Sequence, residues 1–480
     1  MSITAALYSA SSGLGVAGRA AQVISNNVAN ALTPGYGARQ IVRTSGQIGG
    51  VQITTISRRE TLSLVTDRRI SEAAMGGAQA RQSAMASISR TVGSADDSFS
   101  LTGRFAALSA RLIEAQSRPD SDVRLGNLQA ALGDLVGHIN AIGEAVQSER
   151  RAADSAIATG VETLNTTLEK VHDLNIRISA GTRSDQDINA LLDQRRVAID
   201  RIADLIPIRE IPRDNGSVSL ITQSGKVILD TRPAEFTFTA TNGMSPAMVN
   251  GGPLSGLKIN GLPVDTARSG NPISGGKMAE FFTLRDETLP NVQAQIDSVA
   301  RNLIERLQAD PIDTTTTSGA PGLLTDDGLA LGATPAAGLA QRLTVNSAID
   351  PGQGGSLYRL RDGLGASAPG NSGDASLLNR LADALDARTI PSDASLTSAS
   401  LNAGGMIDSM LAAVTGAAFQ AEIGLTEAAG RHDTMLQSEQ AEGVNVDDEM
   451  RQLLLVEQSY AANARVIEVA GSMIQRLLEI

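Results

Sequence analysis

Cysteine and tryptophan are absent from this 480-residue chain, and aromatic residues make up only 2% of it. Without cysteine the chain has no disulfides, no thiolate nucleophile and no cysteine-ligated metal, and its redox compartment cannot be read from cysteine pairing. With 4 tyrosines and 7 phenylalanines, it has little material for a flat apolar pocket that binds a cofactor or stacks on bases. Small residues must do most of the packing, which suits closely spaced helices.

An excess of basic residues is also lacking, since the formal net charge is -12 and the pI is about 4.9. This balance argues against a nucleic acid partner, because such binding needs clustered Lys and Arg. No window approaches the roughly 18 apolar residues of a membrane-spanning helix, and the first residues lack the pattern of a secretory signal. We therefore expect no membrane insertion and no cleaved signal peptide.

Acidic residues are missing from residues 1–59, which contain five arginines and several serines. This composition leaves open an organelle transit peptide. The length of the whole chain predicts about two to four domains.

Both ends of the chain carry apolar residues in a heptad pattern, with alternating steps of four and three. The N-terminal pattern comprises Ile3, Leu7, Ala10, Leu14, Ala17, Ala21, Ile24 and Val28. The C-terminal pattern comprises Val446, Met450, Leu453, Tyr460, Ala464, Ile467, Ile474 and Leu478, and it is interrupted by Glu457 and Gly471. Asn445 precedes three acids and is expected to cap the C-terminal helix. The alternatives are a surface helix on its own core, or helices that pair with each other and with other copies.

The interior predicts helices over about 61–92, 101–117, 121–180, 278–309 and 404–440, and short strands between turns over 208–275. The predicted fold is mainly α with inserted β, in which long terminal helices form an antiparallel coiled coil. The expected domains are a terminal coiled coil (1–45 with 441–480), a helical-bundle rod domain (46–207 with 276–310 and 401–440), a β-rich outer domain (208–275) and a loop-rich insertion (311–400).

Catalytic chemistry finds little support in the sequence. GLGVAG at 13–18 matches G-x-G-x-x-G, but no strand precedes it and the first acid is Glu60, so its glycines are better explained by close helix packing. The three histidines, His138, His172 and His432, form no ligand pair. We predict no catalytic, cofactor-binding or metal-binding residue and no enzyme. A self-assembling structural subunit and a helical binding module, such as a secreted effector or adhesin, both remain possible.

Two terminal motifs point to a known family. SNNVANALTPGY, from Ser25 to Tyr36, resembles the S-N-N-[IV]-A-N-x-x-T-P-G-[YF] signature of bacterial flagellar axial proteins. The C-terminal EGVNVDDEMRQLLLVEQSYAANARVIEVAGSMIQRLL is similar to the paired signature at the other end of the same proteins. The presence of both motifs argues against a transit peptide.

Interior segments resemble the hook-associated branch of this family. They are LNIRI at 174–178, LLDQRRVAIDRIADLIPI at 191–208 and GGKMAEFFTLRDETLPNVQAQIDSVARNL at 275–303. Arg196 stands where an Asp is usual, and the Gly-Asp-rich passage of the family is reduced here to GLLTDDG. Other axial proteins, of the hook or rod type, share the terminal motifs and remain alternatives.

The resemblance implies a structural subunit of the extracellular flagellum that is exported through the flagellar type III pathway with a dedicated chaperone. It implies a junction layer between hook and filament, built as a ring of about eleven copies that contacts the hook protein and a second junction protein, hook-associated protein 3. The residues expected to form the assembly interface are Leu7, Leu14, Ile24, Asn26, Asn27, Asn30, Pro34, Gly35, Tyr36, Asn445, Met450, Leu453, Gln458, Tyr460, Asn463, Ile467 and Ile474.

Asparagine side chains beside an apolar seam have a physical role of their own. Asn26, Asn27 and Asn30 recur at helical spacing, and a buried amide fixes the register and the neighbour of a helix rather than adding stability. Pro34 and Gly35 are then expected to end the helix and turn the chain outward.

Overall fold

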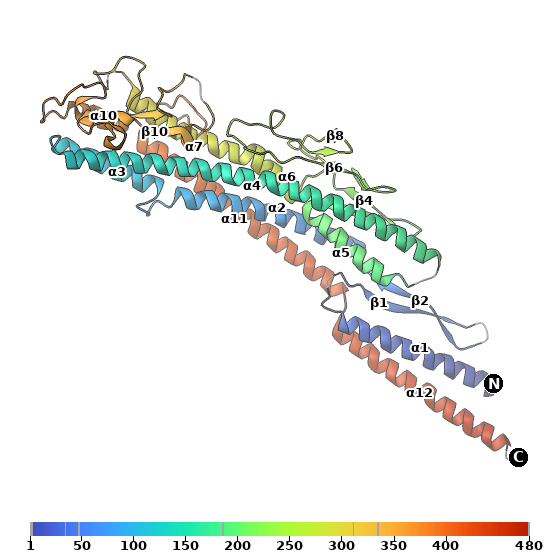
Figure 1. Ribbon diagram of the computed structural model, residues 1–480. Helices are drawn as coiled ribbons and strands as arrows, with labels where there is room; N and C mark the ends of the chain where they lie inside the picture. The colour runs from blue at the N-terminus through green and yellow to red at the C-terminus, as the bar shows by residue number, and fades with distance from the viewer. Residues whose placement is uncertain are drawn as a thin grey trace. The chain divides into compact units, whose positions relative to one another are not determined.

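Long helices dominate the fold, as the apolar spacing predicts (Figure 1). The computed structural model describes residues 3–33, 35–46, 49–184, 187–310, 312–333 and 336–478. The long helices are α1 (Ile3–Ala29), α2 (Leu62–Val92), α3 (Leu101–Ser117), α4 (Asp122–Arg183), α5 (Asn189–Leu205), α7 (Leu289–Gln308), α11 (Ala403–Glu442) and α12 (Val446–Leu478). The shorter helical elements are α6 (Lys277–Thr283), the π-helical η1 (Leu284–Thr288), α8 (Leu339–Arg342), η2 (Ser347–Ile349), η3 (Pro351–Gln353), α9 (Arg359–Asp362) and α10 (Ser376–Asp386). The fold class, mainly α with some β, is confirmed.

The strands form four small antiparallel sheets in the described part of the chain. One is a hairpin of β1 (Ala38–Ser45) and β2 (Val51–Arg59), whose register shifts between Val42 and Arg43. The other strands are β3 (Ile208–Pro212), β4 (Val218–Thr222), β5 (Val227–Leu229), β6 (Phe236–Thr237), β7 (Lys258–Ile259), β8 (Leu262–Pro263), β9 (Leu324–Asp326) and β10 (Leu343–Val345). The sheet orders are β3-β4-β5, β6-β7-β8 and β10-β9.

Two compact units divide the chain. Unit 1 comprises Met1–Met75, Thr163–Ala234 and Ala428–Ile480, and unit 2 comprises Gly76–Glu162 and Glu235–Glu427. The strands of 208–275, expected in one β-rich domain, build two separate sheets. The sheet β3-β4-β5 lies in unit 1 and the sheet β6-β7-β8 in unit 2. The predicted domain boundaries stay a prediction.

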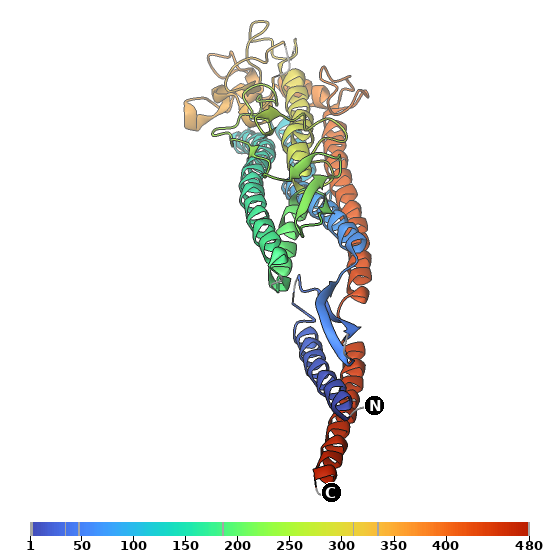
Figure 2. The same cartoon turned by 90° about the vertical axis from the view of Figure 1, so that its right-hand side faces the viewer.

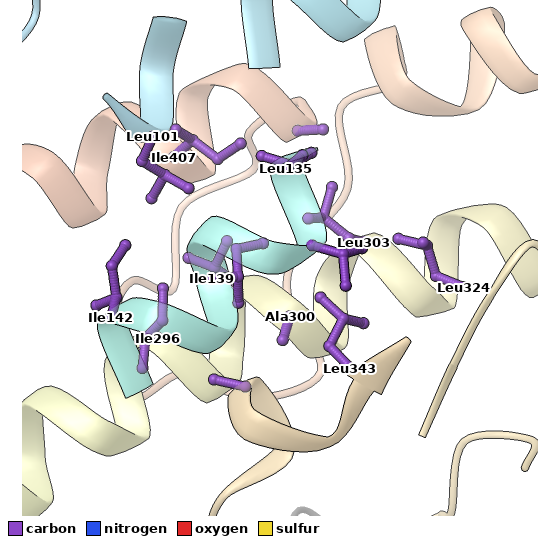
Figure 3. Close-up of a cluster of buried hydrophobic side chains, with 14 of the residues drawn as sticks. Leu101, Leu135, Ile139, Ile142, Ile296, Ala300, Leu303, Leu324, Leu343 and Ile407 are labelled. Carbon is purple, nitrogen blue, oxygen red and sulfur yellow. The ribbon is translucent and has the colours of Figure 1, made fainter. Parts of the chain in front are cut away.

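Unit 2 has an extensive apolar core between its helices. Figure 3 shows Ile139 and Ile142 of α4 facing Ile296 and Ala300 of α7, with further aliphatic residues around them. Burial of these side chains supplies the main favourable contribution to folding of this unit. The insertion at 311–400 contributes short elements to the same core, including Leu343 of β10.

Arginine side chains hold the irregular segments of unit 2 in place. Arg306 of α7 donates from Nη1 to the carbonyl of Ala384 (2.9 Å) and from Nη2 to that of Leu401 (2.7 Å). Arg285 of η1 is fully buried, pairs with Asp154 at 2.8 Å and lies 5.0 Å from the ring centroid of Phe282. Ala384 is in the last turn of α10, where carbonyls lack a partner within the helix, and the carbonyl of Leu401 also accepts from the backbone N–H of Thr389. Arg306 therefore ties the end of α10 and the segment that ends at Leu401 to α7.

The terminal helices α1 and α12 lie side by side in unit 1 (Figures 1 and 2). They run antiparallel, because Asn27 near the end of α1 meets Glu449 at the start of α12, while Gly13 lies opposite Asn463. A Cβ atom on Gly13 would lie 2.7 Å from Nδ2 of Asn463, so the missing side chain permits the close approach. No helix in the described part of the chain is long and apolar enough to cross a bilayer.

The β1–β2 hairpin was not predicted. Its strands, ARQIVRTS and VQITTISRR, contain several β-branched residues on both sides of paired glycines, which is typical of a hairpin. The expected terminal domain placed residues up to 45 in a coiled coil, whereas the helix ends at Ala29 and the chain continues as strands.

Candidate assembly interface

Asn27 links three elements of the terminal region in unit 1. Its Nδ2 donates to the carbonyl of Arg39 in β1 (2.8 Å) and to Oε1 of Glu449 in α12 (3.0 Å). Its Oδ1 accepts from the hydroxyl of Tyr36 (2.9 Å) and from the backbone N–H of Arg39 (3.0 Å). The residue is 1% exposed, and its amide fills both donor and both acceptor positions. The side chain therefore fixes how α1, β1 and α12 meet.

Tyr36 and Arg39 extend this contact. Burial raises the pKa of Tyr36, with a smaller opposing effect from the charge of Arg39, so at neutral pH the phenol keeps the proton that it donates to Asn27. The guanidinium of Arg39 lies 5.0 Å from the centroid of the Tyr36 ring and pairs with Asp193 of α5 at 3.1 Å. The hydrogen bonds of Asn27 thus continue into an ion pair on α5.

One face of α5 carries four charged residues, Asp193, Arg196, Asp200 and Asp204, and we call the first three of them the α5 stripe. Their spacing of three and four residues places them on one side of the helix. Asp193 pairs with Arg39 and with Arg58 (3.4 Å), and Asp200 pairs with two arginines of α2.

The centre of the α5 stripe has the opposite sign. Arg196 pairs with Glu60, where Nη1 lies 2.9 Å from Oε1, and with Glu439 of α11. Glu439 also pairs with Arg68 of α2 at 2.6 Å. Along the α5 stripe the partners are therefore basic, acidic and basic. The first come from the hairpin, the second from the loop after it and from α11, and the third from α2.

Two hollows flank these contacts in unit 1. The first, of about 510 Å³, lies between α1, the hairpin and α12 and is lined by Val16, Ile24, Arg43 and Leu455 among others. The second, of about 740 Å³, lies between the end of α1, the start of α2, α5 and the end of α11. Neither has a cluster of metal-ligating side chains among the residues that the structure describes. The arrangement offers surfaces for protein contact.

Family profiles match the chain at both ends and in the middle. The profile of the flagellar hook-associated protein FlgK helical domain matches residues 85–322. The profile of the flagellar basal body rod FlgEFG protein C-terminal region matches 437–480, and that of the flagella basal body rod protein matches 7–36. The chain belongs to the FlgK family of flagellar hook-associated proteins.

Individual relatives are distant in sequence. Flagellar hook-associated protein 1 of Salmonella typhimurium is 23% identical over 231 residues, which make up 46% of this chain and 41% of that protein. The same values hold for flagellar hook-associated protein 1 of Salmonella typhi. The structure of the flagellar hook junction protein FlgK from Burkholderia pseudomallei aligns with a TM-score of 0.45 and 16% identity, over 54% of this chain and 46% of that chain. Each alignment spans less than half of the relative's length.

The interior segments that resemble the FlgK family supply buried polar contacts that the sequence did not reveal. In unit 1, Arg195 donates to Oδ1 of Asn175 (3.0 Å) and to the carbonyl of Gly216 (2.7 Å). Asn175 in turn donates to the carbonyl of Val218 (2.8 Å), so these two side chains hold the sheet β3-β4-β5 against α4 and α5. Their signal is a polar residue at a position that helical spacing would make apolar.

The predicted interface residues of α1 fall into two groups. Ile24 and Asn27 are buried, whereas Leu7 and Leu14 are half-buried and Asn26 is exposed. Asn30 caps its own helix end, donating to the carbonyl of Asn26 (2.9 Å) and accepting from Thr33.

The turn after α1 depends on a glycine. Gly35 has a φ of 79°, and a Cβ there would lie 2.5 Å from a methyl of Val197. Its carbonyl accepts from Arg58 at 3.0 Å. Pro34 lies outside the described residues.

The predicted interface residues of α12 divide in the same way. Leu453, Asn463 and Ile467 are half-buried, on the side of α12 that meets α1. Met450, Gln458, Tyr460 and Ile474 are exposed. Asn445 accepts from the backbone N–H of Asp447 (3.0 Å), so it caps α12 as predicted. Leu453, Tyr460, Ile467 and Ile474 are seven residues apart, so the predicted seam lies on one side of α12. A second, exposed apolar stripe lies on another side and comprises Leu455, Val466, Val469 and Met473.

Proposed function

We propose that this chain is a structural subunit of the flagellum that assembles with copies of itself as a ring-like layer between hook and filament, and that it has no enzymatic activity. The observation that carries the proposal is the pairing of two family-matched termini through Asn27 and Glu449. In this proposal α1 and α12 form an antiparallel coiled coil, and the exposed apolar stripe of α12 packs on neighbouring copies.

The proposed partners follow from the family. They are about ten further copies in a closed ring, the hook protein on one side and the second junction protein, hook-associated protein 3, on the other. Export through the flagellar type III pathway with a dedicated chaperone would deliver the chain to the outside of the cell. The residues proposed for the interface are those named from the sequence, with the hairpin added.

A gene deletion tests the position in the flagellum. In the deletion strain we expect normal hooks without filaments and filament protein in the medium, as seen by electron microscopy and immunoblot. Absent hooks would instead assign the chain to the hook or rod proteins. Normal filaments together with a monomeric purified protein would favour a secreted binding module.

A pair of substitutions tests the interface. Val469→Asp with Met473→Asp places charges on the exposed stripe of α12, where both side chains contact solvent in the monomer. We expect loss of motility with an unchanged circular dichroism melt, because the charges are buried only between copies. Ala461→Asp with Gln475→Asp is the matched control, since it adds the same two charges at exposed positions of the same helix outside this stripe. Equal motility of both variants would contradict the interface.

A further inference from the structure

The three residues of the α5 stripe all face partners of opposite charge in only one alignment of the stripe with its partners. Along α5 the signs run negative, positive, negative, and the partners run positive, negative, positive. One helical turn is about 5.4 Å, so a shift of the partners by one turn would bring like charges together. Like charges at close range exclude an alignment more effectively than apolar contacts, which tolerate sliding.

The apolar face and the charged face of α5 have different roles. Ala198, Ile199 and Ile202 are buried on the apolar face and hold the helix in unit 1. The charged face forms ion pairs with the hairpin, the end of α11 and the start of α2. The position of α5 is therefore set independently of the groups that pair with its stripe.

The charged contacts are poorly suited to maximal stability. The Nε atoms of Arg58 and Arg196 and one terminal nitrogen of Arg69 are buried without a hydrogen-bond partner among the described residues. Burial lowers the pKa of Arg196, and the carboxylates of Glu60 and Asp200 only partly oppose this. Buried ion pairs with imperfect hydrogen bonding often add little net stability, and their best-attested use is to fix a register.

We propose that the α5 stripe is a positioning surface: Asp193, Arg196 and Asp200 determine where the β1–β2 hairpin and the end of α11 lie, at little gain in stability. Arg196 is the central positioning residue, because it contacts acids from two different segments. The stripe thus sets the direction in which the hairpin leaves the body of unit 1, which the apolar core does not specify.

The absence of cysteine from the chain makes a direct test straightforward. Ser45→Cys on β1 and Arg201→Cys on α5, both at exposed positions, carry spin labels in the full-length protein. Pulsed electron paramagnetic resonance then measures the distance between the hairpin and α5. We expect one narrow distance population in this parent protein.

Three variants are compared in this background. Arg196→Glu should add a second, longer distance population, because it faces the carboxylates of Glu60 and Glu439. Arg196→Met should keep the narrow distance, which Asp193 and Asp200 still set, and should lower the melting temperature less than Arg196→Glu does, because it removes a partner of Glu60 and Glu439 without adding repulsion. Arg213→Glu is the matched control, since it reverses a charge in an exposed ion pair of the same unit with Asp230.

Two results would overturn the proposal. An unchanged distance in Arg196→Glu would show that the stripe does not position the hairpin. A fall in melting temperature in Arg196→Met as large as that in Arg196→Glu would show that the pairs stabilise the fold. If Arg196→Glu does not fold, Asp193→Asn with Asp200→Asn removes both outer charges without repulsion and must broaden the distance, or the proposal fails.

Discussion

Helices α7 and α12 have similar apolar spacing and opposite surroundings. Most residues of α7 are buried, including the polar Gln293, Asp297 and Arg306. Of the α12 residues whose burial the structure describes, Ala470 alone is buried, and apolar residues such as Leu455 are exposed. An amphipathic pattern therefore identifies a helix without revealing whether its partner lies in the same chain. The comparison separates a helix that stabilises the monomer from one whose contacts lie elsewhere.

The largest expected difference between these helices is in the cost of removing one aliphatic side chain. Ile296→Ala in α7 opens a cavity at a fully buried site and should lower the free energy of unfolding by about 2–5 kcal/mol. Leu455→Ala in α12 removes a side chain that is 64% exposed and should change it by less than about 0.5 kcal/mol. Urea titrations of the monomer give both values. Similar losses would remove the distinction between the helices.

A second test asks whether the terminal region has any anchor of its own. Asn27→Ala leaves the hydroxyl of Tyr36 and the backbone groups of Arg39 without a partner, which costs about 1–3 kcal/mol. We expect faster proteolysis within residues 30–60 and little change in the melt of unit 2. Asn26→Ala is the control, because that neighbouring side chain is exposed. If both variants are cleaved at the parent rate, Asn27 is not an anchor.

Acid should change the stability contributions of two buried aspartates, one in each unit, with opposite sign. For Asp200 in unit 1, burial raises the pKa but Arg69 and Arg68 outweigh it, so the pKa is lowered. Its contribution to stability is present above the ordinary pKa of 3.8 and is lost as pH falls through the lower folded value. The free-energy difference between the parent and Asp200→Asn should therefore shrink below about pH 4.

The corresponding group in unit 2 is Asp297. Burial raises its pKa, although hydrogen bonds from the backbone of Ala340 and Gly338 oppose this effect. Its contribution is present below the ordinary pKa of 3.8 and is lost as pH rises through the raised value. The difference between the parent and Asp297→Asn should grow as pH falls. Urea titrations at a series of pH values measure both, and the same sign in both variants would contradict the assignment.

The smallest effect concerns two glycines of α1. In an exposed helix, Gly→Ala stabilises by roughly 1 kcal/mol, and Gly15→Ala should do so because a Cβ there meets open space. Gly13→Ala should stabilise the protein less than this or destabilise it, since its Cβ meets the side chain of Asn463. Asn463→Ala in the Gly13→Ala background should restore the gain. Thermal melts of the terminal region followed by circular dichroism check the order.

Much of the helical fold follows from the sequence. The helices predicted over 61–92, 101–117 and 404–440 match α2, α3 and α11 within a few residues, because long periodic segments give a strong signal. The β1–β2 hairpin was not predicted, since its strands are short, alternate poorly between apolar and polar residues and follow a strong helix signal. The sheet membership of 208–275 depends on contacts with α4 and other distant elements, which spacing along the chain does not carry.

The candidate site was predicted less completely. Asn27 was expected beside an apolar seam and is buried there, because an asparagine among small apolar residues is a visible exception. The α5 stripe was not predicted, because charged residues on one side of a helix usually face solvent. Their partners are distant in sequence and come close only in the folded chain. The exposed apolar stripe of α12, with Leu455 and Met473, was not predicted, because these residues lie outside the heptad seam that Leu453 and Tyr460 share.

The arginine anchors of unit 2 have a consequence for the order of folding. Arg306 binds carbonyls of Ala384 and Leu401, which lie 78 and 95 residues further along the chain. Ala384 lies in the last turn of α10 and Leu401 pairs with Thr389 in an isolated bridge, and the segment between them has no long helix or strand of its own. We therefore expect it to become ordered only after α7 has formed and presents the guanidinium group of Arg306. Closure of so long a loop is slow relative to helix formation. In the refolding of unit 2, α7 therefore precedes the 384–401 segment, and amide protection should appear in that sequence.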